Sequence, residues 1–195
     1  MTAVLSTLVG SRICHDLISP IGAISNGIEL LSMTGMETTP ELALIRDSVE
    51  NANARIRMFR IAFGAAGEEQ TVSNAEAANI LETLGRASRC SYHWDVTEAQ
   101  ARADVRLAFL LVMCLETALP YGGEIHVMAD GTGWRLTADA ERMQVDPALW
   151  RILEGQPAPD LAAAQVHFLL LAQIIGSERR QVRMTQSASQ LSVVF

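Results

Sequence analysis

Residues 11–22 read Ser-Arg-Ile-Cys-His-Asp-Leu-Ile-Ser-Pro-Ile-Gly, and their apolar residues recur at steps of three and four. The same spacing continues on both sides of this stretch, which is typical of one apolar stripe along an α-helix. The stripe consists of Leu5, Val9, Ile13, Leu17, Ile21, Ile24, Ile28 and Leu31. The pattern therefore predicts a long N-terminal helix that ends at the break Met33-Thr34-Gly35-Met36-Glu37.

A second helix is predicted after this break. Thr38 or Thr39 can cap it, Pro40 suits its first turn, and Glu41 is placed for a capping box. A heptad seam of the helical-bundle kind then follows. It comprises Leu42, Ile45, Val49, Ala52, Ile56, Phe59 and Phe63. A lone antiparallel hairpin cannot enclose two such stripes, so we expect a homodimer with a central four-helix bundle. The alternative is that the hairpin packs on its own C-terminal half.

The rest of the chain mixes strand and helix patterns, which indicates an α+β fold with helices on one face of a sheet. We place the hairpin at residues 1–66, a small polar linker at 67–72 and the second domain at 73–195. Ser73 is expected to cap the first helix of this domain, and Asp130-Gly131-Thr132-Gly133 to form a hairpin turn. The expected helices cover 73–84, 104–119, a short segment after Asp146-Pro147, and 160–176, with Asp160 as a cap; the expected strands cover 92–96, 125–129, 134–138, 181–186 and 190–195.

The composition excludes several classes of partner. The chain has 195 residues, with 15 basic and 22 acidic side chains and a net charge of -7, and every basic residue is arginine. An acidic chain without a basic run is a poor ligand for nucleic acid or for an anionic membrane. Cys14, Cys90 and Cys114 form no paired motif, which favours a reducing cytoplasm. We find no secretory signal, and the longest charge-free stretch, 161–177, is too short and polar to span a membrane.

His15 lies two residues from both Ile13 and Leu17, so its side chain should point away from the stripe and toward water. Short or polar side chains follow on the same outward face, and this face could admit the surface of another protein. It carries Arg12, His15, Ser19, Gly22 and Asn26. A plain solvated face is the alternative, and it accounts for the polar residues but not for the glycine.

Two helix-breaking residues lie just after this histidine. Pro20 costs about 3 kcal/mol inside a helix because it removes a backbone hydrogen bond, and Gly22 adds about 1 kcal/mol relative to alanine. Unfavourable local choices of this kind tend to mark functional sites. The alternative is that Pro20 is a tolerated kink.

Elimination leaves one chemistry for an outward imidazole. No serine or cysteine comes with an oxyanion-hole motif, and Cys14 points about 100° away from His15 on a helix. His93, His126 and His167 lie on separate predicted elements without ligand spacing, so we interpret them as structural and expect no metal site. What remains is a nucleophilic imidazole that accepts a phosphoryl group, with Asp16 orienting the ring or taking its proton.

The second helix supplies positive charge at the level of His15. Folding the hairpin brings residue 15 beside residues near 57, where Arg55, Arg57 and Arg60 occur without an acidic residue three or four positions away. These arginines could hold an acidic partner or phosphoryl oxygens. The alternative is that they only keep the bundle soluble.

The motif His15-Asp16-Leu17-x-x-Pro20, followed by Ile21 and Ile24, resembles the phosphoacceptor box of histidine kinases. The wider run from Cys14 to Leu31 resembles the ChpT-type histidine phosphotransferases of alphaproteobacterial phosphorelays. This resemblance implies a dimeric four-helix bundle followed by a degenerate Bergerat domain, the ATP-binding fold of histidine kinases. It implies that His15 accepts a phosphoryl group from the receiver domain of a hybrid kinase. The group would then pass to response regulators of the CtrA and CpdR kind, with Mg²⁺ supplied by the receiver.

The same resemblance implies supporting roles for two residues of the first helix. Asp16 matches the acidic neighbour of the phosphoacceptor, and Ser19 occupies a position that often faces the receiver. The expected docking set, which helical geometry and charge complete, comprises Arg12, Ser19, Gly22 and Asn26 of the first helix and Arg55 and Arg57 of the second.

The second domain departs from a working kinase. Its long helix has Val112, Cys114 and Glu116 where kinases carry an asparagine box, and no Gly-x-Gly lid precedes the last helix. We therefore expect no ATP binding, no bound cofactor and a docking role for this domain. An active histidine kinase and a non-catalytic, receiver-binding dimeric adaptor are the two alternatives.

Overall fold

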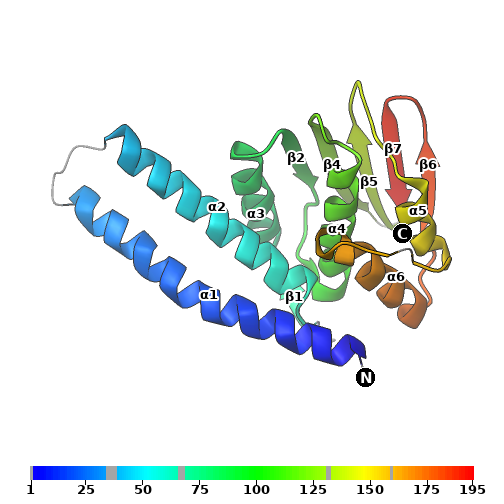
Figure 1. Ribbon diagram of the computed structural model, residues 1–195, viewed down its shortest axis with the longest axis horizontal. Helices are drawn as coiled ribbons and strands as arrows, with labels where there is room; N and C mark the ends of the chain where they lie inside the picture. Colours follow the sequence, from blue (N-terminus) through cyan, green and yellow to red (C-terminus); the bar gives the residue numbers. More distant parts are fainter. Residues whose placement is uncertain (1, 34–38, 66–68, 131–132, 159) are drawn as a thin grey trace. The chain divides into compact units, whose positions relative to one another are not determined.

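The computed structural model describes residues 2–33, 39–65, 69–130, 133–158 and 160–195. The chain forms two compact units, residues 1–65 and 66–195, and each is described by itself. The first is a helical hairpin and the second is a mixed sheet with helices (Figure 1). The predicted α+β class with an N-terminal hairpin is thus confirmed. None of the helices in the described ranges has the length and apolar character needed to cross a membrane.

The hairpin consists of α1 (Thr2–Met33) and α2 (Pro40–Ala62). The side chain of Thr39 caps α2 by accepting the Leu42 N–H at 3.3 Å, which confirms the predicted cap. Thr38, which a capping box with Glu41 requires, lies outside the described residues, as does most of the predicted break.

Two contacts set the antiparallel register of the hairpin. Asn53 Nδ2 donates to Ser25 Oγ at 3.1 Å. Further along, a Cβ atom added to Gly10 would lie 3.2 Å from Phe63 Cβ, so the glycine allows the helices to approach closely. His15, which lies between Gly10 and Ser25, is therefore level with residues between Asn53 and Phe63, as predicted.

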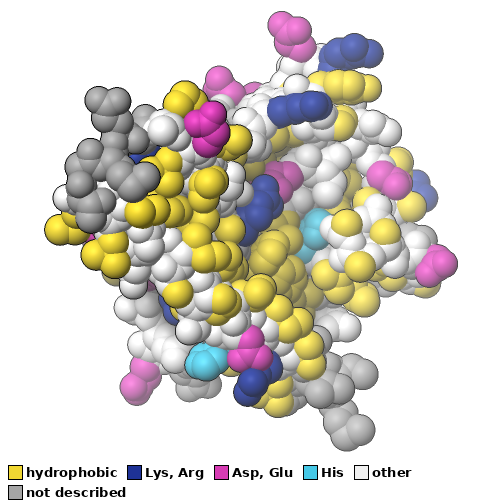
Figure 2. Space-filling model, turned by 60° about the vertical axis from the view of Figure 1, so that its left-hand side comes forward, with side chains coloured by type: hydrophobic (Ala, Val, Ile, Leu, Met, Phe, Trp, Pro, Cys, Tyr) yellow, Lys and Arg dark blue, Asp and Glu magenta, His cyan; other side chains and the backbone are white. Residues whose placement is uncertain are grey.

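The face that α1 turns toward α2 includes Cys14 and Ile28, which are only 5% and 8% exposed. Of the predicted apolar stripe, Ile28 lies on this face, whereas most of the other described members are exposed in the single chain, by 41–54%. These side chains are Val9, Ile13, Leu17, Ile24 and Leu31. This exposure agrees with the expectation that a lone hairpin cannot enclose the stripe, because two helices can cover only one face of each other. Figure 2 shows apolar side chains open on the molecular surface.

The second unit contains a five-stranded sheet with the order β2-β4-β5-β7-β6. Strands β2 and β4 pair in parallel and the other pairs are antiparallel. The strands are β2 (Cys90–Asp95), β4 (Gly123–Asp130), β5 (Gly133–Asp139), β6 (Arg183–Gln186) and β7 (Gln190–Val194). Asp130 pairs with Gly133, which confirms the predicted hairpin between β4 and β5.

Helices α3 (Asn74–Arg86), α4 (Arg102–Thr117) and α6 (Val166–Glu178) lie on one side of this sheet (Figure 1). Alternate strand residues point into the resulting core, as expected for a sheet with one solvated face. Fully buried core side chains include Phe109, Leu110, Leu111, Ile125, Leu136 and Phe168. Smaller elements are α5 (Pro147–Trp150) and the 3₁₀ turns Arg151–Glu154 and Ala163–Gln165.

The ends of several elements differ from the predictions. Ser73 caps α3 as expected, with its side chain accepting the Glu76 N–H at 3.1 Å. The last helix instead starts at Val166, because residues 163–165 form a 3₁₀ turn in which Gln165 Oε1 accepts the Ala162 N–H. Asp160 is therefore not its cap. The predicted linker also contains a short strand, β1 (Thr71–Val72), which pairs with β3 (Gln100–Ala101).

Candidate functional site

His15 lies near the middle of α1, and its side chain is 84% exposed. This confirms that the imidazole points away from the hairpin interior. The neighbouring Cys14 faces α2 instead, and burial raises the pKa of its thiol while the positive charge of Arg60 opposes the shift. A buried neutral thiol is a poor nucleophile, so the adjacent cysteine does not form a reactive pair with the histidine.

Arg12, Asp16 and His15 form a chain of polar contacts on the outside of α1. Arg12 Nε donates to Asp16 Oδ2 at 2.8 Å, one helical turn along. His15 Nδ1 lies 3.4 Å from Asp16 Oδ1. The hydrogen bond from Arg12 is the main reason why the pKa of Asp16 is below its ordinary value, and the contact with His15 adds to this effect. Asp16 is therefore a carboxylate at neutral pH.

The position of Asp16 distinguishes the two ring nitrogens of His15. A carboxylate beside Nδ1 favours the neutral tautomer that carries its proton on Nδ1. The lone pair then lies on Nε2, which forms no hydrogen bond with any described residue. Of the two roles predicted for Asp16, the low pKa favours orientation of the ring over proton removal.

The helix is continuous through Pro20, which lies inside α1. Because proline has no N–H group, the Asp16 carbonyl receives no helical hydrogen bond from residue 20. The long helix predicted through Pro20 is thus confirmed, and one backbone acceptor beside the site lacks its helical hydrogen bond, as expected for an internal proline.

The rest of the predicted docking face on α1 is accessible. Arg12, Ser19 and Asn26 are exposed, and Gly22 is half-buried. A Cβ atom added to Gly22 would meet no heavy atom within 4 Å. Packing of the described chain therefore does not require glycine here.

The arginines of α2 differ in exposure. Arg55 and Arg60 are exposed, whereas Arg57 is half-buried. None of them is joined to His15 by a hydrogen bond or ion pair between described residues. They lie at the predicted level of the hairpin, and their role in docking remains a prediction.

Two histidines of the C-terminal unit are not scattered, contrary to the prediction. His93 on β2 is directly opposite His126 on β4, and their rings stack with centroids 4.3 Å apart. Sequence reasoning missed this pair because parallel pairing of these two strands cannot be deduced from their spacing. His167 is different: it is buried on α6, and burial lowers its pKa to about 4. A buried neutral ring fits the structural role predicted for it.

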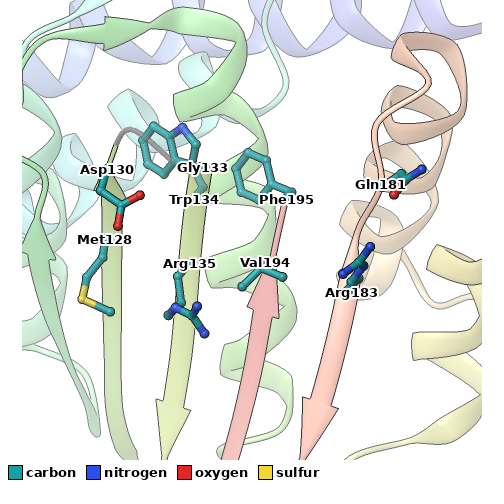
Figure 3. Close-up of a pocket in the computed structure, with 9 residues that line it drawn as sticks. All are labelled: Met128, Asp130, Gly133, Trp134, Arg135, Gln181, Arg183, Val194 and Phe195. Atoms are coloured by element: carbon teal, nitrogen blue, oxygen red, sulfur yellow. The ribbon is translucent and has the colours of Figure 1, made fainter.

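A surface hollow of about 340 Å³ lies at the end of the sheet formed by β4, β5, β7 and β6. Figure 3 shows the side chains that line it, with Arg135 and Arg183 on the strands that flank Val194. The remaining lining residues are Met128, Asp130, Gly133, Trp134, Gln181 and Phe195. None of these residues belongs to the predicted site.

Comparison with known proteins identifies the family. Residues 74–190 match the family model of the histidine phosphotransferase C-terminal domain. The chain belongs to the histidine phosphotransferase family. It is 32% identical over 182 residues to the protein phosphotransferase ChpT of Brucella abortus (strain 2308), a match that covers 88% of this chain and 87% of the relative.

A solved structure of a bacterial phosphotransferase, determined at 1.7 Å, also matches. Its TM-score is 0.66 at 28% identity, over 94% of this chain and 91% of that one. The resemblance to ChpT-type phosphotransferases that the first helix carries is thus confirmed across most of the chain.

Proposed function

We propose that this phosphotransferase is the phosphoryl carrier of a two-component phosphorelay, with His15 as the phosphoacceptor. The family supports the reaction class. One observation carries the assignment to His15: its imidazole is exposed, with Nδ1 beside an ionised carboxylate and Nε2 open to an incoming protein. The partners in this proposal are the receiver domain of a hybrid kinase, as donor, and response regulators of the CtrA and CpdR kind, as acceptors.

The proposed step is an in-line transfer between two side chains. The Nε2 lone pair attacks the phosphorus of the receiver's aspartyl phosphate, an N–P bond forms, and the P–O bond to the aspartate breaks. The aspartate leaves as a carboxylate, and the ring becomes a phosphoimidazolium that keeps its proton on Nδ1. Asp16 stabilises this cation through its contact with Nδ1. Transfer to the next receiver reverses the same bonds, and Mg²⁺ belongs to the receiver in both directions.

Arg12 has a double role in this proposal. It fixes the Asp16 carboxylate through the 2.8 Å hydrogen bond, and its own side chain is 77% exposed and available to an acidic surface. Ser19, Gly22 and Asn26 offer little bulk on the same face, and Arg55 and Arg57 add positive charge from α2. Together they suit the acidic pocket of a receiver domain, where charge complementarity speeds encounter.

We further propose that the C-terminal unit binds no ATP. The α4 positions where a kinase has its asparagine box carry buried Val112 and Cys114, and the Glu116 carboxylate accepts a 2.6 Å hydrogen bond from the Tyr92 hydroxyl. This part of α4 thus packs in the core through Val112 and Cys114 and bonds to β2 through Glu116. Incubation with radiolabelled ATP and Mg²⁺ alone should leave the protein unlabelled, whereas label that disappears in His15→Gln would establish an active kinase.

The proposed homodimer follows from two separate faces of α1. One face, with Cys14 and Ile28, packs on α2. The exposed apolar stripe is centred roughly 75° further round the helix, at about 100° per residue. In a four-helix bundle each helix contacts two neighbours, so a second copy would cover this stripe. His15 lies well away from both faces, on the outside of such a bundle.

Transfer of label from a phosphorylated receiver tests the function directly. The wild-type chain should acquire acid-labile label and pass it to a second receiver, and His15→Gln should acquire none. Because His15 is exposed, this variant should keep its circular dichroism spectrum and thermal midpoint.

Asp16→Asn should retain the labelled site but transfer about tenfold more slowly, because a neutral amide stabilises the phosphoimidazolium less well. Normal receiver binding without any label on wild-type protein would instead identify an adaptor. Label that persists in folded His15→Gln would move the phosphoacceptor to another residue.

A further inference from the structure

The solvated face of the C-terminal sheet gathers histidines and carboxylates on two neighbouring strands. Parallel pairing places His93 of β2 opposite His126 of β4. Glu124 lies two residues before His126, and Asp95 two residues after His93, so all four side chains point to the same face of the sheet. This cluster belongs to the C-terminal unit and takes no part in the proposed phosphotransfer site on α1.

Three of these residues already present donor atoms close together. One ligand atom each from His93, Glu124 and His126 lies within 4.8 Å of the other two. His126 Nε2 is 3.5 Å from Glu124 Oε2. Bonds of about 2.0–2.1 Å in a tetrahedral zinc site place neighbouring ligand atoms roughly 3.3 Å apart. His126 Nε2 and Glu124 Oε2 are therefore already close to the spacing of two ligand atoms in a tetrahedral zinc site.

Asp95 lies on the other side of the His126 ring from Glu124. Its Oδ2 atom lies 3.8 Å from His126 Nδ1, the nitrogen that does not face Glu124. Histidines that bind metals commonly direct their second ring nitrogen to a carboxylate, which fixes the tautomer and makes the ligand more basic. Asp95 would leave His126 Nε2 free for the metal.

We propose that His93, Glu124 and His126 form a zinc-binding site, with Asp95 positioning His126 and water in the fourth place. Two imidazoles with one carboxylate suit Zn²⁺ and not Mg²⁺, which prefers oxygen ligands. The exposed His93 ring leaves its stacked position to bring one nitrogen to the metal. The bound ion joins β2 to β4 and stabilises the sheet.

Isothermal titration of the full chain with zinc chloride tests this proposal. One ion should bind per chain. His126→Gln and His93→Gln should each weaken binding at least tenfold. The matched control is His15→Gln, which removes an exposed histidine from the other unit and should leave the affinity unchanged. Titration with magnesium chloride should give no binding at this site.

Thermal unfolding provides a second readout, because a ligand that binds only the folded state raises its stability. Zinc should raise the midpoint of the wild-type chain but not that of His126→Gln. Asp95→Asn should keep all three ligands and bind several-fold more weakly. The proposal is overturned if wild-type chain binds no zinc at 1 mM, if half an ion binds per chain, or if both histidine variants retain wild-type affinity.

Discussion

Asp16 lies between two basic side chains of its own helix, and its charge depends on both. Arg12 holds it from one side at 2.8 Å, and His15 Nδ1 contacts it from the other at 3.4 Å. The pKa of Asp16 is lowered, so this carboxyl group favours folding above its unfolded-state pKa. That contribution is lost as the pH falls through the lower pKa of the folded state. The orientation of His15 should therefore persist to pH values well below neutrality.

Replacing Arg12 should raise the pKa of Asp16. In Arg12→Gln the strongest cause of the shift is gone, so the carboxyl pKa should move up toward its ordinary value, measured by NMR titration of the side-chain carbon. Arg46→Gln, which removes an arginine paired with Asp47 on α2, is the matched control. An unchanged Asp16 titration in Arg12→Gln would show that the 2.8 Å hydrogen bond does not operate in solution.

His167 should make the stability of the fold depend on pH. Its folded pKa of about 4 is below that of an unfolded histidine, so the unfolded chain takes up a proton first and stability falls as the pH drops from about 6.5 to 4. Between pH 7 and 5 this amounts to roughly 2 kcal/mol. Urea unfolding should show this extra loss in wild type and not in His167→Leu. Equal pH dependence in both proteins would mean that the buried ring is hydrated or protonated when folded.

At the scale of the helix, α1 shows how much a single sequence could predict. The period of three and four identified the helix, and the position of His15 relative to Ile13 and Leu17 predicted its outward direction, because both depend only on helical geometry. The face that packs on α2 could not be chosen, because α1 is apolar over a wide arc. That choice depends on long-range contacts such as those of Gly10 with Phe63 and of Asn53 with Ser25.

The C-terminal unit shows the same division between local and long-range information. Caps at Ser73 and Asp146 and the β4–β5 hairpin were predictable because each depends on a few consecutive residues. The start of α6 was not, because Gln165 forms a local turn that competes with the expected cap at Asp160. The pairing of His93 with His126 depends on strand order, which the pattern of a single strand does not contain.

Replacing Gly22 tests two effects separately: the approach of a receiver domain to the docking face, and the stability of α1. Gly22→Ala and Gly27→Ala should each stabilise α1 by about 1 kcal/mol, since no atom lies within 4 Å of the added Cβ at either position. Only Gly22→Ala should slow transfer from a phosphorylated receiver, because only Gly22 shares the face of His15. Thermal unfolding and label transfer together measure both effects. Equal transfer rates would remove Gly22 from the docking face.

At the scale of the whole molecule, the exposed apolar stripe of α1 is the surface through which we expect two copies of the chain to dimerise. Ile24 is 47% exposed in the single chain, so Ile24→Arg should not disturb the hairpin itself. It should nevertheless abolish the proposed dimer, because the charge would be buried between copies. Sedimentation should show a monomer with unchanged helical circular dichroism.

Leu44→Arg is the matched control for assembly. It replaces an apolar residue that is 69% exposed on α2 and lies outside the predicted seam, so this variant should remain dimeric. If Ile24→Arg still sediments as a dimer, the stripe is not the interface.

All three cysteines are buried, and each of the two units contains at least one, so thiol reactivity can report when either unit opens. Cys14 is enclosed in the hairpin, while Cys90 and Cys114 are enclosed in the C-terminal unit, and burial raises the pKa of all three thiols. Alkylating reagents attack thiolates, so the folded chain should react slowly and each sulfur should become reactive only when its surroundings separate. Mass spectrometry after timed iodoacetamide treatment therefore measures how fast Cys14 becomes reactive as α1 separates from α2. The reactivity of Cys90 and Cys114 reports separately on opening of the C-terminal unit.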